Sequence, residues 1–334
     1  MTIKDIARES GYSISTVSRV LNQRRDVSPE ARSRIMEVVS QYNFVLNNNA
    51  KHLKQTISES IAVIVKGTSN MLFASIVEEI QKIVEKTKYS VGVFYIDEDG
   101  NEVEQAILLC RERKPMGILF LGGNPHFFEE RFSEVSIPCV LVTNQGDEMH
   151  FDNLSSVAVD DVQAGKCALD YLFEQGHRKI GILGGDLQGS YTSRLRLLGG
   201  EKSFEEHNQK FDADKYYVKA RFSYESGYQA MNHLLEKAPD ITAVFAMSDV
   251  MAIGAIRALR DKKLNVPDDI SIIGFDGTTL ADYYNPKLAT IKQKYKTLAV
   301  RSVEIIFSLI EQESGVIHEE VPFELITGES IKKI

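Results

Sequence analysis

The sequence predicts a mixed α/β protein in which a small all-α domain precedes a larger region of parallel β-sheet. Short, capped amphipathic segments fill the first 45 of the 334 residues. From about Ser60, strand-like and helical segments alternate. Charge divides at nearly the same place. Positions 1–55 hold nine Lys and Arg against five Asp and Glu, net +4, and since the whole chain is −8, positions 56–334 are net −12.

The composition excludes several classes of protein. With 43% hydrophobic residues the chain can bury sizeable cores. Cys110, Cys139 and Cys167 are odd in number and widely spaced, which fits a reducing compartment better than a disulfide framework. The start "MTIKDIARES" lacks the apolar segment of a secretory signal, and no apolar run reaches the ~20 residues of a membrane span. We therefore expect a cytoplasmic protein.

The first 45 residues carry the signals of three short helices. Thr2 and Asp5 form a capping box, and Gly11 suits the end of that helix. Ser13 can cap a second helix, and Ser28-Pro29-Glu30 opens a third. Two short helices joined by a tight turn, with a third closing the core, predict a helix-turn-helix. The side chains expected to be buried are Ile3, Ile6, Ala7, Val17, Val20, Leu21, Ile35, Val38, Val39 and Tyr42.

The second helix of this unit has a polar outer side. With Val17 and Val20 turned inward, the outward residues are Ser15, Thr16, Ser18, Arg19 and Asn22. Hydroxyl groups and arginine bind base edges or phosphates, and Ile14 can contact a thymine methyl group. A polar surface helix with no partner is the alternative. The basic charge of this domain and its three caps favour DNA binding.

The region after Ser60 predicts parallel sheets. The expected strands are "SIAVIVK", "VGVFYI", "GILFL", "PCVLVT", "KIGILGG", "AVFAM" and "ISIIGF". Helical segments follow most of them, such as 74–86, 162–175 and 250–262. Some 270 residues are too many for one small doubly wound sheet, so we expect two sheets side by side. Ligands bind beyond the carboxyl ends of such strands.

Residues just beyond the predicted strands form a candidate ligand site. Aromatic rings, arginines and carboxylates are the groups that recognise a sugar by stacking and by paired hydroxyl hydrogen bonds. Ser248 serves equally well as a helix cap, and Asp276, before Gly277, also suits a turn. The candidates from this argument are Phe73, Arg194, Arg196, Phe222, Ser248, Asp249 and Asp276.

Several stretches resemble the LacI/GalR family of bacterial transcription regulators. "TIKDIARESGYSISTVSRVLN" is similar to the family's N-terminal signature, and "EQGHRKIGILGG", "FAMSDVMAIGAIRAL" and "NVPDDISIIGFD" extend the likeness along nearly the whole chain. The resemblance implies a helix-turn-helix domain over 1–45, a hinge over 46–58, and a two-lobed, periplasmic-binding-protein-like effector and dimerisation domain over 59–334. It also implies three passages between the lobes, near 157–160, 287–291 and 317–322.

The resemblance assigns DNA contacts in two segments. Ile14, Ser15 and Arg19 lie where the family reads bases in the major groove. Thr2, at the start of the first helix, is also counted among the predicted DNA contacts. In the hinge, Ala50, Leu53 and Lys54 correspond to the helix that inserts a leucine into the minor groove. One departure is Leu46-Asn47, where relatives usually have proline and asparagine.

The resemblance also assigns effector contacts. Arg196, three residues before Gly199, resembles the family's ligand-binding arginine. Asp276 resembles its ligand-binding aspartate and Phe222 its aromatic residue. Asp160 and Gln293 lie at positions that the family uses around the pocket. Thr143 stands where several relatives carry an aspartate, so no ligand bond is expected from it.

Other functions are less well supported by the sequence. "GGDLQGSY" has glycines at phosphate-loop spacing but lacks the lysine, no G-x-S-x-G occurs, and the histidines show no metal-ligand spacing. No catalytic residue, metal site or cofactor is predicted. An exported sugar-binding protein would need a signal and no basic head.

The expected function is a DNA-binding regulator, most simply a repressor of carbohydrate-utilisation genes. We expect a homodimer, because the C-terminal "GESIKKI" carries no leucine heptads of the kind that join dimers into tetramers. A two-fold dimer in turn requires a near-palindromic operator. A sugar is favoured over a purine because Leu72-Phe73 replaces paired aromatic residues. Purine-responsive and phosphocarrier-responsive regulation stay open, as do a sugar-acting enzyme and the choice between induction and corepression.

Overall fold

The computed structural model describes residues 3–21, 24, 27–42 and 59–334 and divides the chain into two compact units, Met1–Ser58 and Glu59–Ile334. We call them the helical domain and the α/β domain. The predicted DNA contacts that lie outside the described residues are Thr2, Asn22, Ala50, Leu53 and Lys54. No described helix is long and apolar enough to cross a membrane.

The helical domain has the three predicted helices, α1 (Ile3–Ser10), α2 (Ile14–Leu21) and α3 (Pro29–Gln41). Gly11 follows α1 with φ 79°, a conformation that glycine adopts without strain. Ser13 Oγ accepts the Thr16 amide at the start of α2, and Ser28 caps α3. Six side chains form the core: Ile6, Ala7, Val17, Val20, Ile35 and Val38.

Three residues of the expected core differ from the rest. Leu21 and Val39 are only partly buried against the cluster. Tyr42, expected in the buried stripe of α3, is 44% exposed. Its position explains this, because α3 ends at Gln41 and Tyr42 is the C-cap residue. The hydrophobic periodicity of the helix therefore does not extend to it.

The first lobe of the α/β domain is a six-stranded sheet with helices on both faces. Its strand order is β11-β5-β4-β3-β1-β2, and all the pairings are parallel. Its elements are β1 (Ser60–Lys66), α5 (Met71–Val84), β2 (Ser90–Ile96), α6 (Glu102–Glu112), β3 (Gly117–Leu121), α7 (Pro125–Arg131), the 3₁₀ helix η1 (Phe132–Glu134), β4 (Cys139–Val142), β5 (Leu154–Ala158), α14 (Tyr295–Ile310) and β11 (His318–Glu320).

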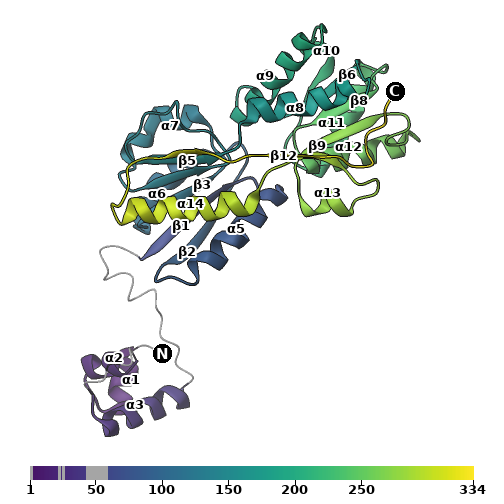
Figure 1. Cartoon of the computed structure of the whole chain (residues 1–334). Helices are drawn as coiled ribbons and strands as arrows, with labels where there is room; N and C mark the ends of the chain where they lie inside the picture. Colours follow the sequence, from purple (N-terminus) through teal and green to yellow (C-terminus); the bar gives the residue numbers. More distant parts are fainter. Residues whose placement is uncertain (1–2, 22–23, 25–26, 43–58) are drawn as a thin grey trace. The chain divides into compact units, whose positions relative to one another are not determined.

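The second lobe repeats this plan in the order β12-β10-β9-β8-β6-β7, with only β12 antiparallel. Figure 1 shows the two sheets with their helices. The elements are α8 (Asp161–Glu174), β6 (Ile180–Gly184), α9 (Tyr191–Glu206), α10 (Ala213–Tyr216), β7 (Tyr217–Lys219), α11 (Tyr224–Lys237), β8 (Ala243–Ala246), α12 (Asp249–Asp261), β9 (Ser271–Asp276), α13 (Thr279–Tyr283), β10 (Ala289–Lys292) and β12 (Glu324–Ile326).

The chain passes between the lobes at three short segments. The first, 159–160, joins β5 to α8 and falls within the expected range. The second, 293–294, follows β10, and the third, 321–323, joins β11 to β12. The expected ranges 287–291 and 317–322 include β10 and β11 themselves. Since those strands still belong to their sheets, the second passage lies two residues beyond its expected range, whereas the third overlaps its expected range at 321–322.

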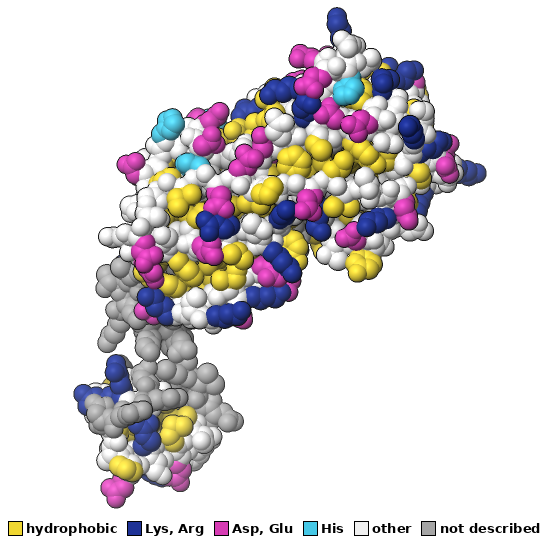
Figure 2. Space-filling view, viewed as in Figure 1, with side chains coloured by type: hydrophobic (Ala, Val, Ile, Leu, Met, Phe, Trp, Pro, Cys, Tyr) yellow, Lys and Arg dark blue, Asp and Glu magenta, His cyan; other side chains and the backbone are white. Residues whose placement is uncertain are grey.

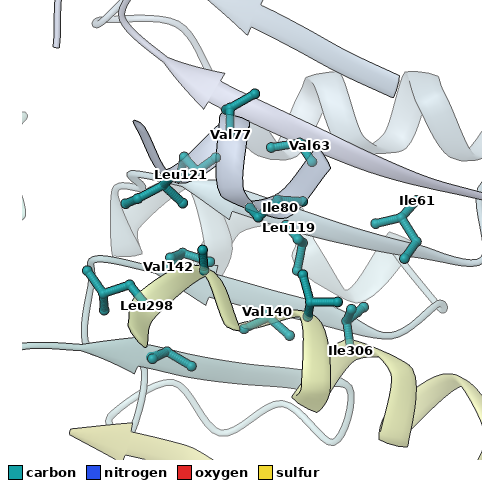
Figure 3. Close-up of a cluster of buried hydrophobic side chains, with 14 of the residues drawn as sticks. Ile61, Val63, Val77, Ile80, Leu119, Leu121, Val140, Val142, Leu298 and Ile306 are labelled. Carbon is teal, nitrogen blue, oxygen red and sulfur yellow. The ribbon is translucent and has the colours of Figure 1, made fainter. Parts of the chain in front are cut away.

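A dense apolar core joins the first sheet to α5 and α14. Val63, Leu119 and Val140 from three neighbouring strands face Ile80 of α5 and Ile306 of α14, and all five are fully buried (Figure 3). The β-branched runs that predicted the strands supply this core. Because α14 is reached only through the second lobe, the first lobe is completed by a late part of the chain.

Two helix pairs on the second lobe pack backbone against backbone through glycines. A Cβ on Gly199 of α9 would lie 1.9 Å from the Val162 carbonyl oxygen of α8, and one on Gly165 of α8 would lie 2.3 Å from the Arg196 carbonyl oxygen. Gly227 and Gly254 hold α11 against α12 in the same way. Only residues without a side chain permit this approach. The close packing of α8 against α9 fixes the position of α9, the helix that carries Arg196.

Candidate functional site

A cavity of about 760 Å³ lies between the lobes of the α/β domain. Its walls are the loops that follow β1, β2, β3 and β4 in the first lobe and β6, β7, β9 and β10 in the second. In both sheets the first strand lies between the second and third, so these loops meet at the carboxyl ends where such folds bind ligands. The predicted residues in the lining are Phe73, Arg196, Phe222, Asp276 and Gln293.

Arg196 is the buried cation of the second lobe's wall. Its Nε donates to Asp161 Oδ1 at 2.7 Å, and Nη1 donates to the Met247 carbonyl at 2.7 Å. The guanidinium also stacks on Phe275, with 3.5 Å between Cζ and the ring centroid. Since a guanidinium has five N–H groups, three are left beyond these two bonds. Arg196 is therefore held rigidly while it retains donor capacity.

Asp276 and Gln293 form a buried pair beside Arg196. Gln293 Nε2 donates to Asp276 Oδ1 at 3.0 Å, and its backbone N–H donates to the Asp276 carbonyl at 3.0 Å. Asp276 has φ 108°, a strained value for a residue with a side chain. Gln293 is 1% exposed, and its Oε1 has no hydrogen-bond partner among the described residues. The pair thus includes an unused buried acceptor on a side chain that lines the cavity.

Burial governs the protonation of Asp276 and of a second buried carboxyl, Asp249. Burial raises the pKa of Asp276 to about 8, although the positive charge of Arg196 opposes the shift. Burial also raises the pKa of Asp249 to about 6 against hydrogen bonds from Thr290 and Thr278. Both carboxyls hold protons more tightly in the folded protein than in the unfolded chain. Their contribution to stability is therefore fully present near pH 4 and is lost as pH rises through the folded pKa.

We expect the Asp276→Asn variant to lose less stability than the wild type as pH rises from 5 to 8. One group with a raised folded pKa changes the free energy of unfolding by at most about 1.4 kcal/mol per pH unit. Urea unfolding followed by circular dichroism across this range measures the difference in slope. Because all the other titrating groups are shared, equal slopes in the two proteins would contradict the raised pKa of Asp276.

Two aromatic side chains come from opposite walls of the cavity. Phe73 follows β1 and contacts Gly122, since a Cβ there would lie 3.3 Å from its ring. Phe222 follows β7, and its backbone N–H donates to Glu98 Oε2 of the first lobe at 3.2 Å. Both are partly buried, so their rings combine packing with exposure to the cavity.

Four other predicted residues lie outside the cavity lining. Asp160 and Ser248 cap α8 and α12 by accepting backbone amides. Asp249 accepts hydrogen bonds from Thr278 and Thr290 in the interior. Arg194 is exposed, with its guanidinium over the Tyr191 ring. Helix caps follow strand ends just as ligand groups do, which is why the strand-end argument selected residues of both kinds.

The lining includes residues that the sequence argument did not select. Tyr95 lies near the end of β2 and Asp97–Asp99 follow that strand, whereas Arg221 and Tyr224 lie near Phe222. Ligand groups are expected after every strand end, including that of "VGVFYI". The acidic run "DED" at 97–99, directly after this strand, was therefore the sequence signal that could have identified these carboxylates. Thr143 also lines the cavity with φ 73°, a strained value for a β-branched residue.

The outer side of α2 carries the described residues predicted to contact DNA. Val17 and Val20 are buried, whereas Ile14 is 46% exposed and Ser15 and Arg19 are exposed. Thr16 and Ser18 are partly exposed. Ser13 Oγ lies 2.7 Å from Ser15 Oγ and 2.8 Å from Thr16 Oγ1. The helix therefore presents hydroxyl, guanidinium and methyl groups on one side.

Both parts of the chain match known families. A family described as "Bacterial regulatory proteins, lacI family" matches residues 2–47, and a "Periplasmic binding protein-like domain" matches 169–331. The HTH-type transcriptional regulator MalR of Clostridium butyricum is 36% identical over 99% of each chain. The HTH-type transcriptional repressor PurR of Histophilus somni (strain 2336) is 30% identical over 100% of this chain and 99% of its own.

A solved structure extends this likeness to the complete architecture. The lac repressor dimer bound to operator and the anti-inducer ONPF is 25% identical over 99% of both chains, with a TM-score of 0.75. These relatives are regulators, which decides against the enzyme alternative. Full-length similarity to MalR, together with the helical domain and the two-lobed α/β domain, shows that the chain belongs to the lacI family of bacterial regulatory proteins as a DNA-binding transcriptional regulator.

Proposed function

We propose that the protein is a homodimeric repressor of carbohydrate-utilisation genes whose affinity for its operator is set by a small sugar in the interlobe cavity. The observation that carries the proposal is the meeting of Arg196, Asp276 and Gln293 with Phe73 and Phe222 in one cavity. The cytoplasm is the compartment that this role requires.

The cavity lining supports a sugar as the effector. Aromatic rings from both lobes can stack on the C–H faces of a pyranose, and buried polar groups can pair with its hydroxyls. Leu72 belongs to the hydrophobic core of the first lobe, which leaves Phe73 as the aromatic side chain at that position. This favours a sugar over a flat purine ring, which paired aromatic side chains would enclose.

The proposed control acts through the angle between the lobes. An effector bound between them stabilises one relative orientation and so changes the separation of the two DNA-binding heads in a dimer. Only a difference in effector affinity between the DNA-bound and free forms transmits the signal, typically ~1–3 kcal/mol. A two-fold dimer then requires a near-palindromic operator.

The edge of the first sheet supports the homodimer. β2 is the terminal strand beside β1, and although its sequence is almost wholly apolar it is only half-buried. Figure 2 shows further hydrophobic side chains among charges of both signs on the viewed face of the α/β domain. An apolar edge strand of this kind is stabilised by a second copy, and the related lac repressor is a dimer.

The direct test is specific DNA binding by the full chain. We expect duplexes selected from a random pool to be bound in preference to random duplexes, with affinity that falls steeply as salt rises. Fluorescence anisotropy measures both properties, with and without candidate sugars. No preference for any selected duplex under either condition would overturn the proposal.

Within this test, Leu53→Ala in the predicted hinge should weaken operator binding at least about tenfold, because the wedge that opens a base step is lost. Effector affinity should stay unchanged. Leu108→Ala is the matched control, since Leu108 is 45% exposed on α6 of the α/β domain. Equal operator affinity of Leu53→Ala and the control would remove the wedge from the mechanism.

A further inference from the structure

The three cations that line the cavity are all engaged by carboxylates. In the first lobe, Lys66 Nζ lies 2.6 Å from Glu102 Oε2, and the Glu102 side chain is fully buried. In the second lobe, Arg196 is paired with the buried Asp161. Each positive charge is neutralised by a carboxylate that belongs to the fold.

The third cation, Arg221, bridges the lobes at the cavity. Its guanidinium comes from the loop after β7, and it lies 2.6 Å from Asp97 and 3.5 Å from Glu98 in the loop after β2. Asp99 is a third partner at 3.7 Å. Three carboxylates therefore face one arginine, so this part of the lining carries excess negative charge.

The other charged groups and the helix N-termini at the cavity do not offset that excess. Lys219, just behind the lining, is paired with Asp186 at 2.6 Å. The helix N-termini at the cavity are capped by Asn70, Ser190 and Ser223, each of which accepts a backbone amide. Against three lysines and arginines, the lining has five carboxyl groups besides Asp276, whose raised pKa keeps it largely protonated at neutral pH: Asp97, Glu98, Asp99, Asp186 and Glu225.

The unused polar atom of the site also indicates the type of ligand. Gln293 Oε1 is buried without a partner among the described residues, and a ligand hydroxyl that reaches it can supply the missing donor. A sugar hydroxyl can donate. A phosphate dianion has only acceptors, and it is bound in proteins by arginine or lysine forks and by uncapped helix N-termini.

From these contacts we infer that the effector is uncharged and that the cavity selects neutral sugars against their phosphate esters. The inference rests on the proposed sugar effector and narrows its chemical class. The phosphate group of an ester in this cavity would meet cations that are already neutralised and a surplus of carboxylates, whereas the remaining hydroxyls of the ester offer nothing that the neutral sugar lacks.

The first test compares matched ligands on the full-length wild-type protein. Glucose, ribose, maltose and cellobiose are each titrated beside their terminal phosphate esters, by thermal shift and calorimetry. For any sugar that binds, we expect the ester to bind at least about tenfold more weakly, because it adds negative charge beside carboxylates that outnumber the cations. An ester that binds as tightly as its neutral partner overturns the inference.

The second test does not depend on the natural effector. Glu102→Gln keeps the shape of the side chain and removes the charge that neutralises Lys66, so this variant should gain a binding site for glucose 6-phosphate that the wild type lacks. Glu104→Gln is the matched control, because Glu104 lies on the same helix outside the lining and is exposed. Should Glu102→Gln fail to fold, Asp97→Asn/Asp99→Asn leaves Arg221 with a single carboxylate partner at the surface.

The outcomes separate this inference from the proposed function. Binding of glucose 6-phosphate by the wild type, or no gain in either charge-neutralised variant, overturns the inference and leaves the regulator intact. If the variants gain phosphate binding while the wild type binds no sugar of either kind, charge selection stands and the sugar effector fails.

Discussion

The Arg196→Ala variant is expected to lose its response to effector and to be less stable than the wild type by about 3–5 kcal/mol. The alanine removes the hydrogen bonds to Asp161 and to the Met247 carbonyl, as well as the stacking on Phe275. Asp161 would be left buried without its counter-charge, which is the main source of the cost. Urea unfolding and effector titration measure the two effects separately.

A double variant distinguishes the structural role of Arg196 from its ligand role. In Arg196→Ala/Asp161→Asn the carboxylate left unpaired by the alanine is gone, so part of the lost stability should return. The effector response should stay absent, because the ligand still lacks the guanidinium. Operator affinity should remain near that of the wild type without effector, since the helical domain is unchanged. A full effector response in either variant would show that Arg196 is not a ligand residue.

The Gly199→Ala variant is expected to lose about 3 kcal/mol of stability and to bind effector weakly. Its added Cβ would lie 1.9 Å from the Val162 carbonyl oxygen, so α8 and α9 would have to separate. The same movement would displace Arg196 from Asp161, because the two residues lie on those two helices. Effector titration and thermal unfolding of the full chain measure the outcome.

Gly200 supplies the matched control on the same helix. A Cβ there would have its nearest neighbours at 3.6 Å, in ordinary van der Waals contact with Leu169. Gly200→Ala should therefore leave stability unchanged or raise it by up to about 1 kcal/mol, the helix preference of alanine over glycine. Similar losses in the two variants would mean that helix separation is not the cause.

Local sequence signals were sufficient for most of the fold. All seven expected strands occur within one residue at each end, because β-branched runs fill the buried centres of parallel sheets. Among the described residues there are five further strands: β5, β7, β10, β11 and β12. β7, β11 and β12 have three residues each, which is too short for a periodic pattern and depends on a neighbouring strand for pairing.

The candidate site was predictable in its location but not in its contacts. Strand ends and family resemblance led to Arg196, Asp276 and Gln293, which do line the cavity. The pairing of Arg196 with Asp161, 35 positions away, arises from two helices packed through glycines and leaves no trace in local sequence. Asp160 and Ser248 were selected because each follows a strand, yet both cap helices. Position after a strand therefore does not distinguish a helix cap from a ligand-binding group.

The connections between the lobes restrict how the domain can open. Each is only two or three residues long. In the first sheet they adjoin the neighbouring strands β5 and β11, and in the second sheet they adjoin the neighbouring strands β10 and β12. With three such short tethers, translation of one lobe away from the other is prevented, and rotation about an axis near the tethers remains. Effectors of different size and chemistry would then differ in one geometric variable only, the opening angle. Ligands of this regulator that favour different lobe orientations should therefore fall on a single graded scale of hinge rotation.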